Sequence, residues 1–291
     1  MMASLKETVE KNNPEYTKSV IKHGLHTDKG KKCVWIVVED HDDIKVYERF
    51  FDNVTILPSE NEDGLKGAAY VESIISEIID EENYKLIFGI RDADYTRYEG
   101  VRHCFHAAIF VTDCRDIEMM MLSSPSVNEA LAQWNKNIPE LLSNGEPVLR
   151  KLGYMRICNH IKSLGCNFKK KVKISKIWDE CSHALCPDWE EKLMDLFLNN
   201  CANCKETFTE KDFESIVKSY GLESESKYNI CQGHDTIKLL QYMLIHTQTF
   251  NERSIMSKMT ESYSFDDFKN TELYKSILLW SKSNKIKVLR S

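Results

Sequence analysis

Three acidic residues follow apolar runs of the chain at the spacing expected of a divalent-metal site. Glu39 closes the run 34–38, and Asp92 and Asp94 come after the run 86–90. Side chains of an extended segment alternate between two sides, so carboxylates at positions i and i+2 point the same way and can share an ion. A cluster of oxygen ligands selects Mg²⁺ or Mn²⁺ over softer metals. These residues therefore predict a magnesium or manganese site.

A third acidic group follows the apolar run 107–111 and comprises Asp113, Asp116 and Glu118. Carboxylates at strand ends also cap helices and make turns, which is the structural alternative for all of these residues. Three such groups favour one site, because open α/β sheets place their chemistry at the carboxyl edge of the strands. Asp116 and Glu118 are candidates for binding a second ion. A purely structural role at a helix start is an equally open interpretation.

The elements that must position these residues alternate between strand and helix. Apolar runs predict strands, and apolar residues at helical spacing predict the helices between them. This alternation implies βαβ crossovers, hence an α/β fold whose mainly parallel sheet is covered by helices on both faces. The predicted strands span residues 34–38, 54–57, 84–90 and 107–111, and the predicted helices span residues 43–51 and a stretch that begins near residue 64.

The pattern changes after residue 125, where convincing strands become scarce. We therefore predict an amino-terminal helix within residues 1–28, a catalytic domain at residues 29–125 and a mostly α-helical carboxyl-terminal domain at residues 126–291. Helical spacing is found in the segments 128–134, 148–164, 189–199, 211–220, 235–246 and 273–281.

Two segments of the predicted catalytic domain resemble motifs of the Toprim family. Residues 38–47, with Glu39 and Asp43, resemble its opening motif Val-Glu-Gly-x-x-Asp-x-x-Phe-Tyr, and residues 91–95 resemble its Asp-x-Asp motif. Asp40 stands where the family has glycine. The resemblance covers about residues 30–125 and implies a Toprim-like, Rossmann-like sheet.

Further motifs are similar to the stand-alone Toprim proteins of bacterial anti-phage systems. These motifs are Gly64-x-Lys66, the stretch 112–118 and, late in the chain, Gly233-His234-Asp235. The group includes the PARIS effector, which works with an ABC-type ATPase. The resemblance implies an antiviral nuclease that depends on Mg²⁺ and is controlled by such a partner.

The same resemblance implies roles for individual residues. Glu39, Asp92 and Asp94 would coordinate Mg²⁺, which activates water and neutralises charge during phosphodiester cleavage, and Glu39 would also act as a general acid or base. Asp43, one helical turn after Glu39, would orient it or bind an outer-sphere water. Its alternative is a carboxylate that stabilises a helix start.

Two motif segments have both functional and structural interpretations. Lys66, near a predicted helix start, is placed to meet a substrate phosphate, or is a solvated lysine. His234 and Asp235 either return to the site or cap the helix that follows them.

A basic stretch without Asp or Glu runs from residue 147 to residue 178. In a chain with a net charge of −6, this segregation predicts a cationic face that binds a nucleic-acid backbone. Tyr154, Phe168 and Trp178 are candidates for stacking on bases, although each is more typical of a core. The alternative is a solvated helical face. The basic residues of the stretch are Arg150, Lys151, Arg156, Lys162, Lys169, Lys170, Lys171, Lys173 and Lys176.

Composition narrows the class of protein. The 291 residues are 42% hydrophobic, which is enough for two cored domains. No signal peptide and no apolar stretch near the roughly 20 residues of a membrane helix are evident, so we expect a cytoplasmic protein that does not bind membranes. Ten cysteines form no regular framework. Cys181, Cys186, Cys201 and Cys204 have poor spacing for zinc.

These observations lead to one preferred prediction and two alternatives. The preferred function is a nuclease that uses Mg²⁺ or Mn²⁺ to cleave DNA or RNA, including tRNA, in defence against phage. The first alternative is a catalytically silent binding module that docks on an ATPase. The second is a primase-like or topoisomerase-like phosphoryl transferase. The absence of a Walker-type loop predicts that the chain does not hydrolyse ATP by itself, and self-association into a homo-oligomer stays open.

Overall fold

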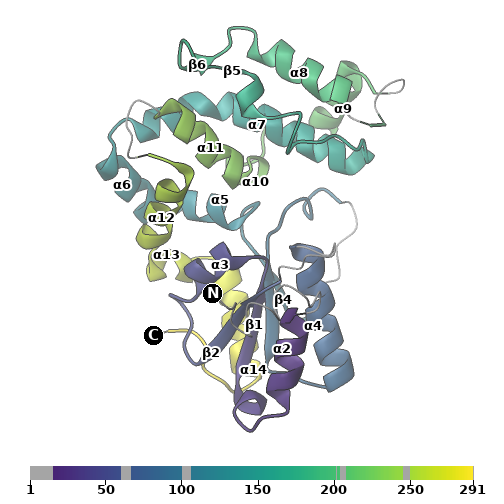
Figure 1. Cartoon of the computed structure of the whole chain (residues 1–291), viewed down its shortest axis with the longest axis vertical. Coiled ribbons are helices and arrows are strands. Elements are labelled where there is room, and N and C mark those ends of the chain that lie inside the picture. Colours follow the sequence, from purple (N-terminus) through teal and green to yellow (C-terminus); the bar gives the residue numbers. More distant parts are fainter. Residues whose placement is uncertain are drawn as a thin grey trace, which may run out of the picture. The chain divides into compact units, whose positions relative to one another are not determined.

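The computed structural model describes residues 16–59, 67–99, 106–200, 202–203, 208–244 and 250–290. The chain forms two compact units (Figure 1). The sheet unit comprises residues 1–92, 103–113 and 268–291, and the helical unit comprises residues 93–102 and 114–267. These units differ from the predicted ranges 29–125 and 126–291, because the carboxyl-terminal segment belongs to the sheet unit and the division near strand four falls before residue 125.

The sheet unit contains a four-stranded parallel sheet with the strand order β2-β1-β3-β4. Trp35 of β1 pairs with Thr55 of β2 on one side and with Ile87 of β3 on the other. The two central strands are buried at every position, as their continuous apolar runs predicted. Pro58 ends an edge strand, where a missing N–H is tolerated. The strands are β1 (Val34–Val38), β2 (Val54–Pro58), β3 (Ile87–Arg91) and β4 (Ile109–Val111).

Helices cover both faces of this sheet. A Cβ atom on Gly89 would lie 2.5 Å from the Val71 side chain of α4, whereas the ring of Phe88 packs on Trp280 of α14 with centroids 4.7 Å apart. Because neighbouring strand residues point to opposite sides, α4 and α14 lie on opposite faces. The helices of this unit are α2 (Tyr16–Leu25), α3 (His41–Tyr47), α4 (Ala68–Glu82) and α14 (Glu272–Ser283), with a 3₁₀ turn at Gly30–Lys32.

The end of the chain is tied to the sheet unit by backbone hydrogen bonds. Asp52 N–H donates to the carbonyl of Val288 at 2.8 Å, and Arg290 N–H donates to that of Phe50 at 3.0 Å. The helical spacing of residues 273–281 correctly predicted a helix. The spacing does not indicate which part of the fold that helix packs against.

The helical unit holds a series of helices and one short antiparallel hairpin. Its longest helix, α7, begins ten residues before the predicted start and runs through Pro147. Its helices are α5 (Ile117–Leu122), α6 (Pro125–Trp134), α7 (Ile138–Lys162), α8 (Trp189–Asn200), α9 (Glu210–Ser219), α10 (Lys227–Ile230), α11 (Gly233–Met243) and α12 (Glu252–Ser262). The hairpin pairs β5 (Trp178–Asp179) with β6 (Ala184–Leu185), a 3₁₀ turn spans Ile174–Lys176, and α13 (Phe265–Lys269) spans the division between the units.

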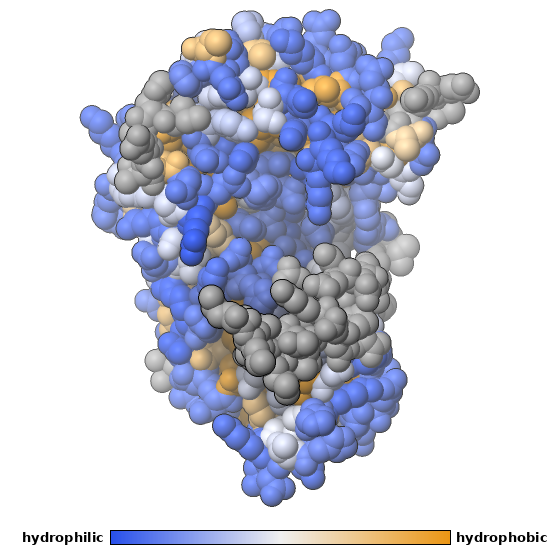
Figure 2. All heavy atoms as spheres, in the orientation of Figure 1, coloured by the Kyte–Doolittle hydropathy of each residue, from blue (hydrophilic) through white to orange (hydrophobic). Residues whose placement is uncertain are grey.

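Hydrophilic residues dominate the one face of the chain that Figure 2 draws. Hydrophobic residues on this face lie in small, separate patches. Within the described residues, no helix combines the length and the apolar composition needed to cross a membrane.

Candidate functional site

Glu39 and Asp92 lie side by side at the carboxyl ends of the two central strands. Glu39 is the first residue after β1 and Asp92 the first after β3, and these strands are hydrogen-bonded neighbours that run parallel. The backbone N–H of Asp92 donates to Oε1 of Glu39 at 2.8 Å. Both residues are half-buried. The structure therefore brings these two predicted residues together at one edge of the sheet.

The start of α4 lies against the second oxygen of Glu39. Gly67 precedes α4 with φ +61° and ψ −139°, a conformation that side-chain-bearing residues rarely adopt. A Cβ atom at this position would lie 2.8 Å from Oε2 of Glu39. The Ser59 hydroxyl donates to the carbonyl oxygens of Glu39 and Gly67, at 2.9 and 3.3 Å. Lys66, the predicted phosphate contact, lies outside the described residues.

Asp43 is a buried carboxyl group among other carboxylates. It forms a capping box with Asp40 at the start of α3, in which Asp40 N–H donates to Oδ2 of Asp43 at 3.1 Å. Only 8% of Asp43 is exposed. Burial, followed by the charges of Asp40 and Glu39, raises the pKa of Asp43 to about 8. Asp43 therefore has the structural contacts of a cap and also belongs to a group of mutually repelling acids.

Asp94 does not continue the strand that precedes it. β3 ends at Arg91, and Asp94 lies in a turn with φ +44°. Its N–H donates to the carbonyl of Arg115 at 2.8 Å. The predicted alternation of Asp92 and Asp94 along an extended segment is therefore wrong, because the strand has ended and the chain turns at Asp94. The two aspartates also fall in different compact units.

Asp116 stabilises the starts of two helices in the helical unit. It is the N-cap of α5, where its Oδ1 accepts from Met119 N–H at 2.9 Å, and its Oδ2 accepts from Gly233 N–H at 2.8 Å. Burial raises the pKa of this carboxyl, while the two backbone donors and Arg115 act in the opposite direction. These contacts match the structural alternative for Asp116.

The late Gly-His-Asp motif reaches Asp116 through its glycine. A Cβ atom on Gly233 would lie 2.2 Å from Cβ of Glu118 and 2.7 Å from Oδ1 of Asp116, so the backbone packs closely there. The other two residues have different contacts. His234 lies 3.7 Å from Glu252, and the carboxylate of Asp235, in the first turn of α11, forms an ion pair with Arg156.

Arg115 is a residue that sequence reasoning missed. It is 1% exposed, and its guanidinium donates to the Ile230 carbonyl at 2.6 Å and to the Tyr95 hydroxyl at 2.9 Å. Burial opposes its charge, but Tyr95, Asp116 and other nearby aspartates raise its pKa above the ordinary value. Its position directly before Asp116 was a signal, since a nearby opposite charge favours the ionised form of a carboxyl group.

Two arginines of the predicted nucleic-acid face are engaged within the helical unit. Arg156 donates to both oxygens of Asp235 at 3.0 and 3.1 Å, and lies over the ring of Phe168. Arg150 donates to the carbonyls of Leu222, Glu223 and Glu225 at 2.9 to 3.0 Å. Both are therefore structural in their present contacts, and the same holds for buried Phe168 and Trp178.

The lysines of the same face differ from these arginines. Lys151 is half-buried, with its ammonium 5.1 Å from the ring centre of Phe213, whereas Lys169, Lys170 and Lys171 are exposed and Lys173 is half-buried. Lys162 and Lys176 are exposed as well, so the lysines supply most of the surface charge of this stretch.

Metal donors of the predicted kind are present at the sheet edge, but they do not form a complete cage. In the parts of the chain that the structure describes, no three His, Cys, Asp or Glu side chains are arranged to hold a metal ion. Glu39, Asp43 and Asp92 offer carboxylate oxygens, which fit Mg²⁺ or Mn²⁺ in kind. Cys181 and Cys186 are free thiols, and Cys201 and Cys204 lie outside the described residues.

Comparison with known proteins identifies no relative: no family model matches the chain, and no curated protein matches it.

Proposed function

We propose that this protein is a nuclease that depends on Mg²⁺ or Mn²⁺ and cleaves the phosphodiester bonds of DNA or RNA. The observation that carries the proposal is the pairing of Glu39 with Asp92 at the ends of adjacent parallel strands, where Asp92 N–H donates to Oε1 of Glu39 at 2.8 Å. The carboxyl edge of a parallel sheet is where α/β folds bind their ligands. The Toprim resemblance of the two motifs supports the same assignment.

The raised pKa of Asp43 supports a cation at this edge. A buried acid that repels Asp40 and Glu39 is stabilised when a positive charge is brought nearby. Glu39 and Asp92 would hold the ion, and Asp94 enters the proposal through the motif resemblance alone. When bound, such an ion lowers the pKa of a water molecule and neutralises charge on the scissile phosphate.

The residues of the chain have roles of their own in this proposal. The Asp92 N–H and the close approach of Gly67 hold the Glu39 carboxylate in one orientation, which suits it to accept a proton from an attacking water. The exposed lysines 169–171 supply positive charge that binds a nucleic-acid backbone. An ABC-type ATPase partner, an antiviral role and a cytoplasmic location complete the proposal on the strength of the resemblance.

Cleavage by the purified full-length chain tests the proposal. Single-stranded DNA, duplex DNA and tRNA are incubated with the protein in Mg²⁺ or Mn²⁺, with and without any ABC-type ATPase that is encoded beside it. Asp92→Asn and Glu39→Gln should remove cleavage, whereas Asp195→Asn, a change at an exposed position in α8, should retain it. Metal-dependent cleavage that survives Asp92→Asn contradicts the proposal.

The arrangement of donors also favours a second candidate, a binding module without catalysis. Within the described residues, no three His, Cys, Asp or Glu side chains are placed to hold a metal ion by themselves, so bound Mg²⁺ would depend on fewer carboxylates and on substrate phosphates. Calorimetric titration with Mn²⁺ in the presence of nucleic acid separates the two candidates. Heat that disappears in Asp92→Asn supports the nuclease, and the absence of any carboxylate-dependent heat supports the binding module.

A further inference from the structure

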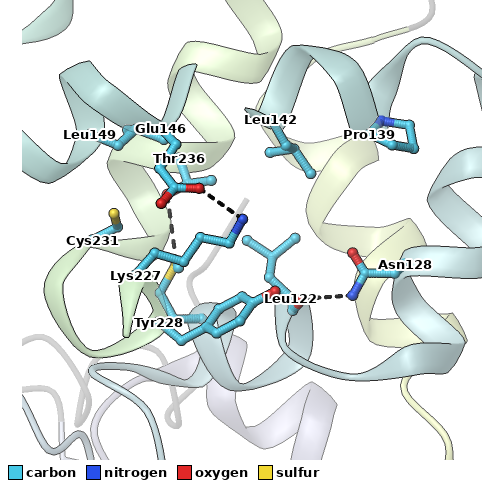
Figure 3. A pocket seen from close by; sticks show the side chains of 11 residues that line it. Leu122, Asn128, Pro139, Leu142, Glu146, Leu149, Lys227, Tyr228, Cys231 and Thr236 are labelled. Carbon is cyan, nitrogen blue, oxygen red and sulfur yellow. Dashed lines mark hydrogen bonds and ion pairs between the residues drawn. The ribbon is translucent and has the colours of Figure 1, made fainter. Parts of the chain in front are cut away.

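A partly enclosed cavity of about 140 Å³ lies within the helical unit (Figure 3). Its walls come from α5, α6, α7, α10 and α11. Most of the lining is apolar and includes Met119, Leu122, Leu142 and Leu149. A small cavity lined by such side chains holds water poorly, because few groups can hydrogen-bond to it.

Charged side chains stand at one side of this cavity. Lys227 Nζ lies 3.1 Å from Oε2 of Glu146, and Arg150 lies 3.7 Å from Oε1 of the same carboxylate. Two cations therefore share one anion. Lys227 and Glu146 line the cavity, whereas Arg150 does not. The wall near Lys227 thus favours negative charge.

Two further polar groups border the apolar space. Figure 3 shows Tyr228 with its ring and hydroxyl beside Leu122, and Asn128 opposite Lys227. The side-chain nitrogen of Asn128 donates to the carbonyls of Leu122 and Ser124, both at 2.8 Å, which fixes the amide and leaves its oxygen as an acceptor. An apolar space with a few convergent polar groups is the usual form of a small-molecule site.

We infer that this cavity binds a small organic carboxylate with a single ring, whose ring lies among Met119, Leu122 and Leu142 and whose carboxylate pairs with Lys227. The size argues for one ring, because an apolar protein cavity of about 150 Å³ accommodates benzene. The charge argues for an anion, because Lys227 and Arg150 share Glu146. The inference is independent of the proposed nuclease.

A protein partner is a less suitable occupant. Docking surfaces have an apolar core larger than one side chain. Among the described residues, the exposed large hydrophobic side chains are Tyr220 and Leu279, and neither lines the cavity. The cavity mouth therefore lacks an apolar surface on which a second protein would pack.

Three ligands of equal ring size test the charge preference on the full-length chain. Benzoate, benzamide and benzamidine carry negative, zero and positive charge, and their binding is measured by calorimetry. We expect benzoate to bind tightest, with a preference over benzamide of roughly threefold to tenfold, the effect of one partly exposed ion pair. Equal binding of all three, tightest binding of benzamidine, or no binding of any at millimolar concentration overturns the inference.

Substitutions and nuclear Overhauser contacts locate the binding. Leu142→Trp should fill the space and abolish benzoate binding, and Lys227→Gln should weaken benzoate to the level of benzamide. Lys192→Gln is the matched control, since Lys192 pairs with Asp188 at 2.9 Å and does not line the cavity. Contacts from the benzoate ring to the methyl groups of Met119 and Leu122 give the location without any variant. Binding that gives no such contacts, or that survives Leu142→Trp in a folded protein, contradicts the site.

Discussion

Asp43 in the sheet unit and Asp116 in the helical unit are both buried aspartates at the start of a helix. The charges of their neighbours have opposite signs. Asp116 accepts from the N–H groups of Met119 and Gly233 and follows the buried cation of Arg115. Asp43 accepts from Asp40 N–H and is surrounded by the carboxylates of Asp40 and Glu39. Burial raises the pKa of both groups, but opposite charge compensates only Asp116.

This difference separates two uses of a buried acid. A carboxylate with backbone donors and a cation beside it holds helices together, and its removal leaves those donors and that cation without compensation. A carboxylate held among other acids costs stability by itself, and such an arrangement is typical of a functional site. The comparison therefore assigns structure to Asp116 and makes the edge near Asp43 the better candidate for a cation.

The largest loss of stability from a substitution is expected from Asp116→Ala. The change leaves the N–H groups of Met119 and Gly233 without their acceptor and removes an anion beside Arg115. We expect a loss of about 3 kcal/mol in the free energy of unfolding, measured by urea denaturation. Asp116→Asn, which retains an acceptor oxygen, should lose less. If both variants lose an equally small part of the free energy of unfolding, the structural role of Asp116 is contradicted.

A matched pair of glycine substitutions compares the same two regions at the backbone. Gly233→Ala places a Cβ atom 2.2 Å from Cβ of Glu118, which is fixed to the backbone. Gly67→Ala places one 2.8 Å from the movable Oε2 of Glu39 and adds strain from φ +61°. We expect about 2 kcal/mol of destabilisation for Gly67→Ala and more for Gly233→Ala. The reverse order in thermal or urea unfolding would contradict the close packing at Asp116.

Asp43→Asn should stabilise the protein at alkaline pH when metal is removed with a chelator. With a pKa of about 8 in the folded state and the ordinary value of 3.8 in the unfolded state, the native protein binds more protons between these pH values. Stability of the unsubstituted protein therefore falls as pH rises through that window, by up to roughly 1.4 kcal/mol per pH unit. Asn cannot ionise, so the advantage of the variant should grow from acid to alkaline pH.

Urea unfolding at several pH values measures this advantage. Asp195→Asn, at an exposed position of the helical unit, is the control and should show no such trend. The stability difference between Asp43→Asn and the unsubstituted protein could instead be the same at every pH. That result would contradict like-charge repulsion at Asp43.

The sheet could be predicted from sequence because its determinants are local. Continuous apolar runs such as 34–38 and 86–90 suit strands buried on both sides, and the parallel arrangement then places Glu39 and Asp92 at one edge. The position of Asp94 was missed because the alternation rule applies only while a strand continues, and β3 ends at Arg91.

The contacts of the two arginines could not be predicted from sequence for a different reason. Arg150 and Arg156 contact residues 72 and 79 positions further along the chain, so no local pattern distinguishes them from solvated charges. Lysines 169–171 belong to the same basic stretch as these arginines, but their side chains are exposed to solvent. Long-range pairing is thus the information that separates structural from surface charge in this stretch.

The smallest expected effect is the stabilisation of the protein by Mn²⁺. If the sheet edge binds a cation and the unfolded chain does not, Mn²⁺ at ten times its dissociation constant should add about 1.4 kcal/mol to the free energy of unfolding. Glu39→Gln and Asp92→Asn should each remove this gain, because they take a carboxylate from the edge where Asp92 N–H contacts Glu39. Asp195→Asn should keep the gain, and so should Asp235→Asn, whose partner is Arg156. The opposite result is a gain that persists in Glu39→Gln and Asp92→Asn but disappears in Asp235→Asn. It would reverse the assignment of the two regions, since Asp235, which pairs with Arg156, would then be the acid that binds metal.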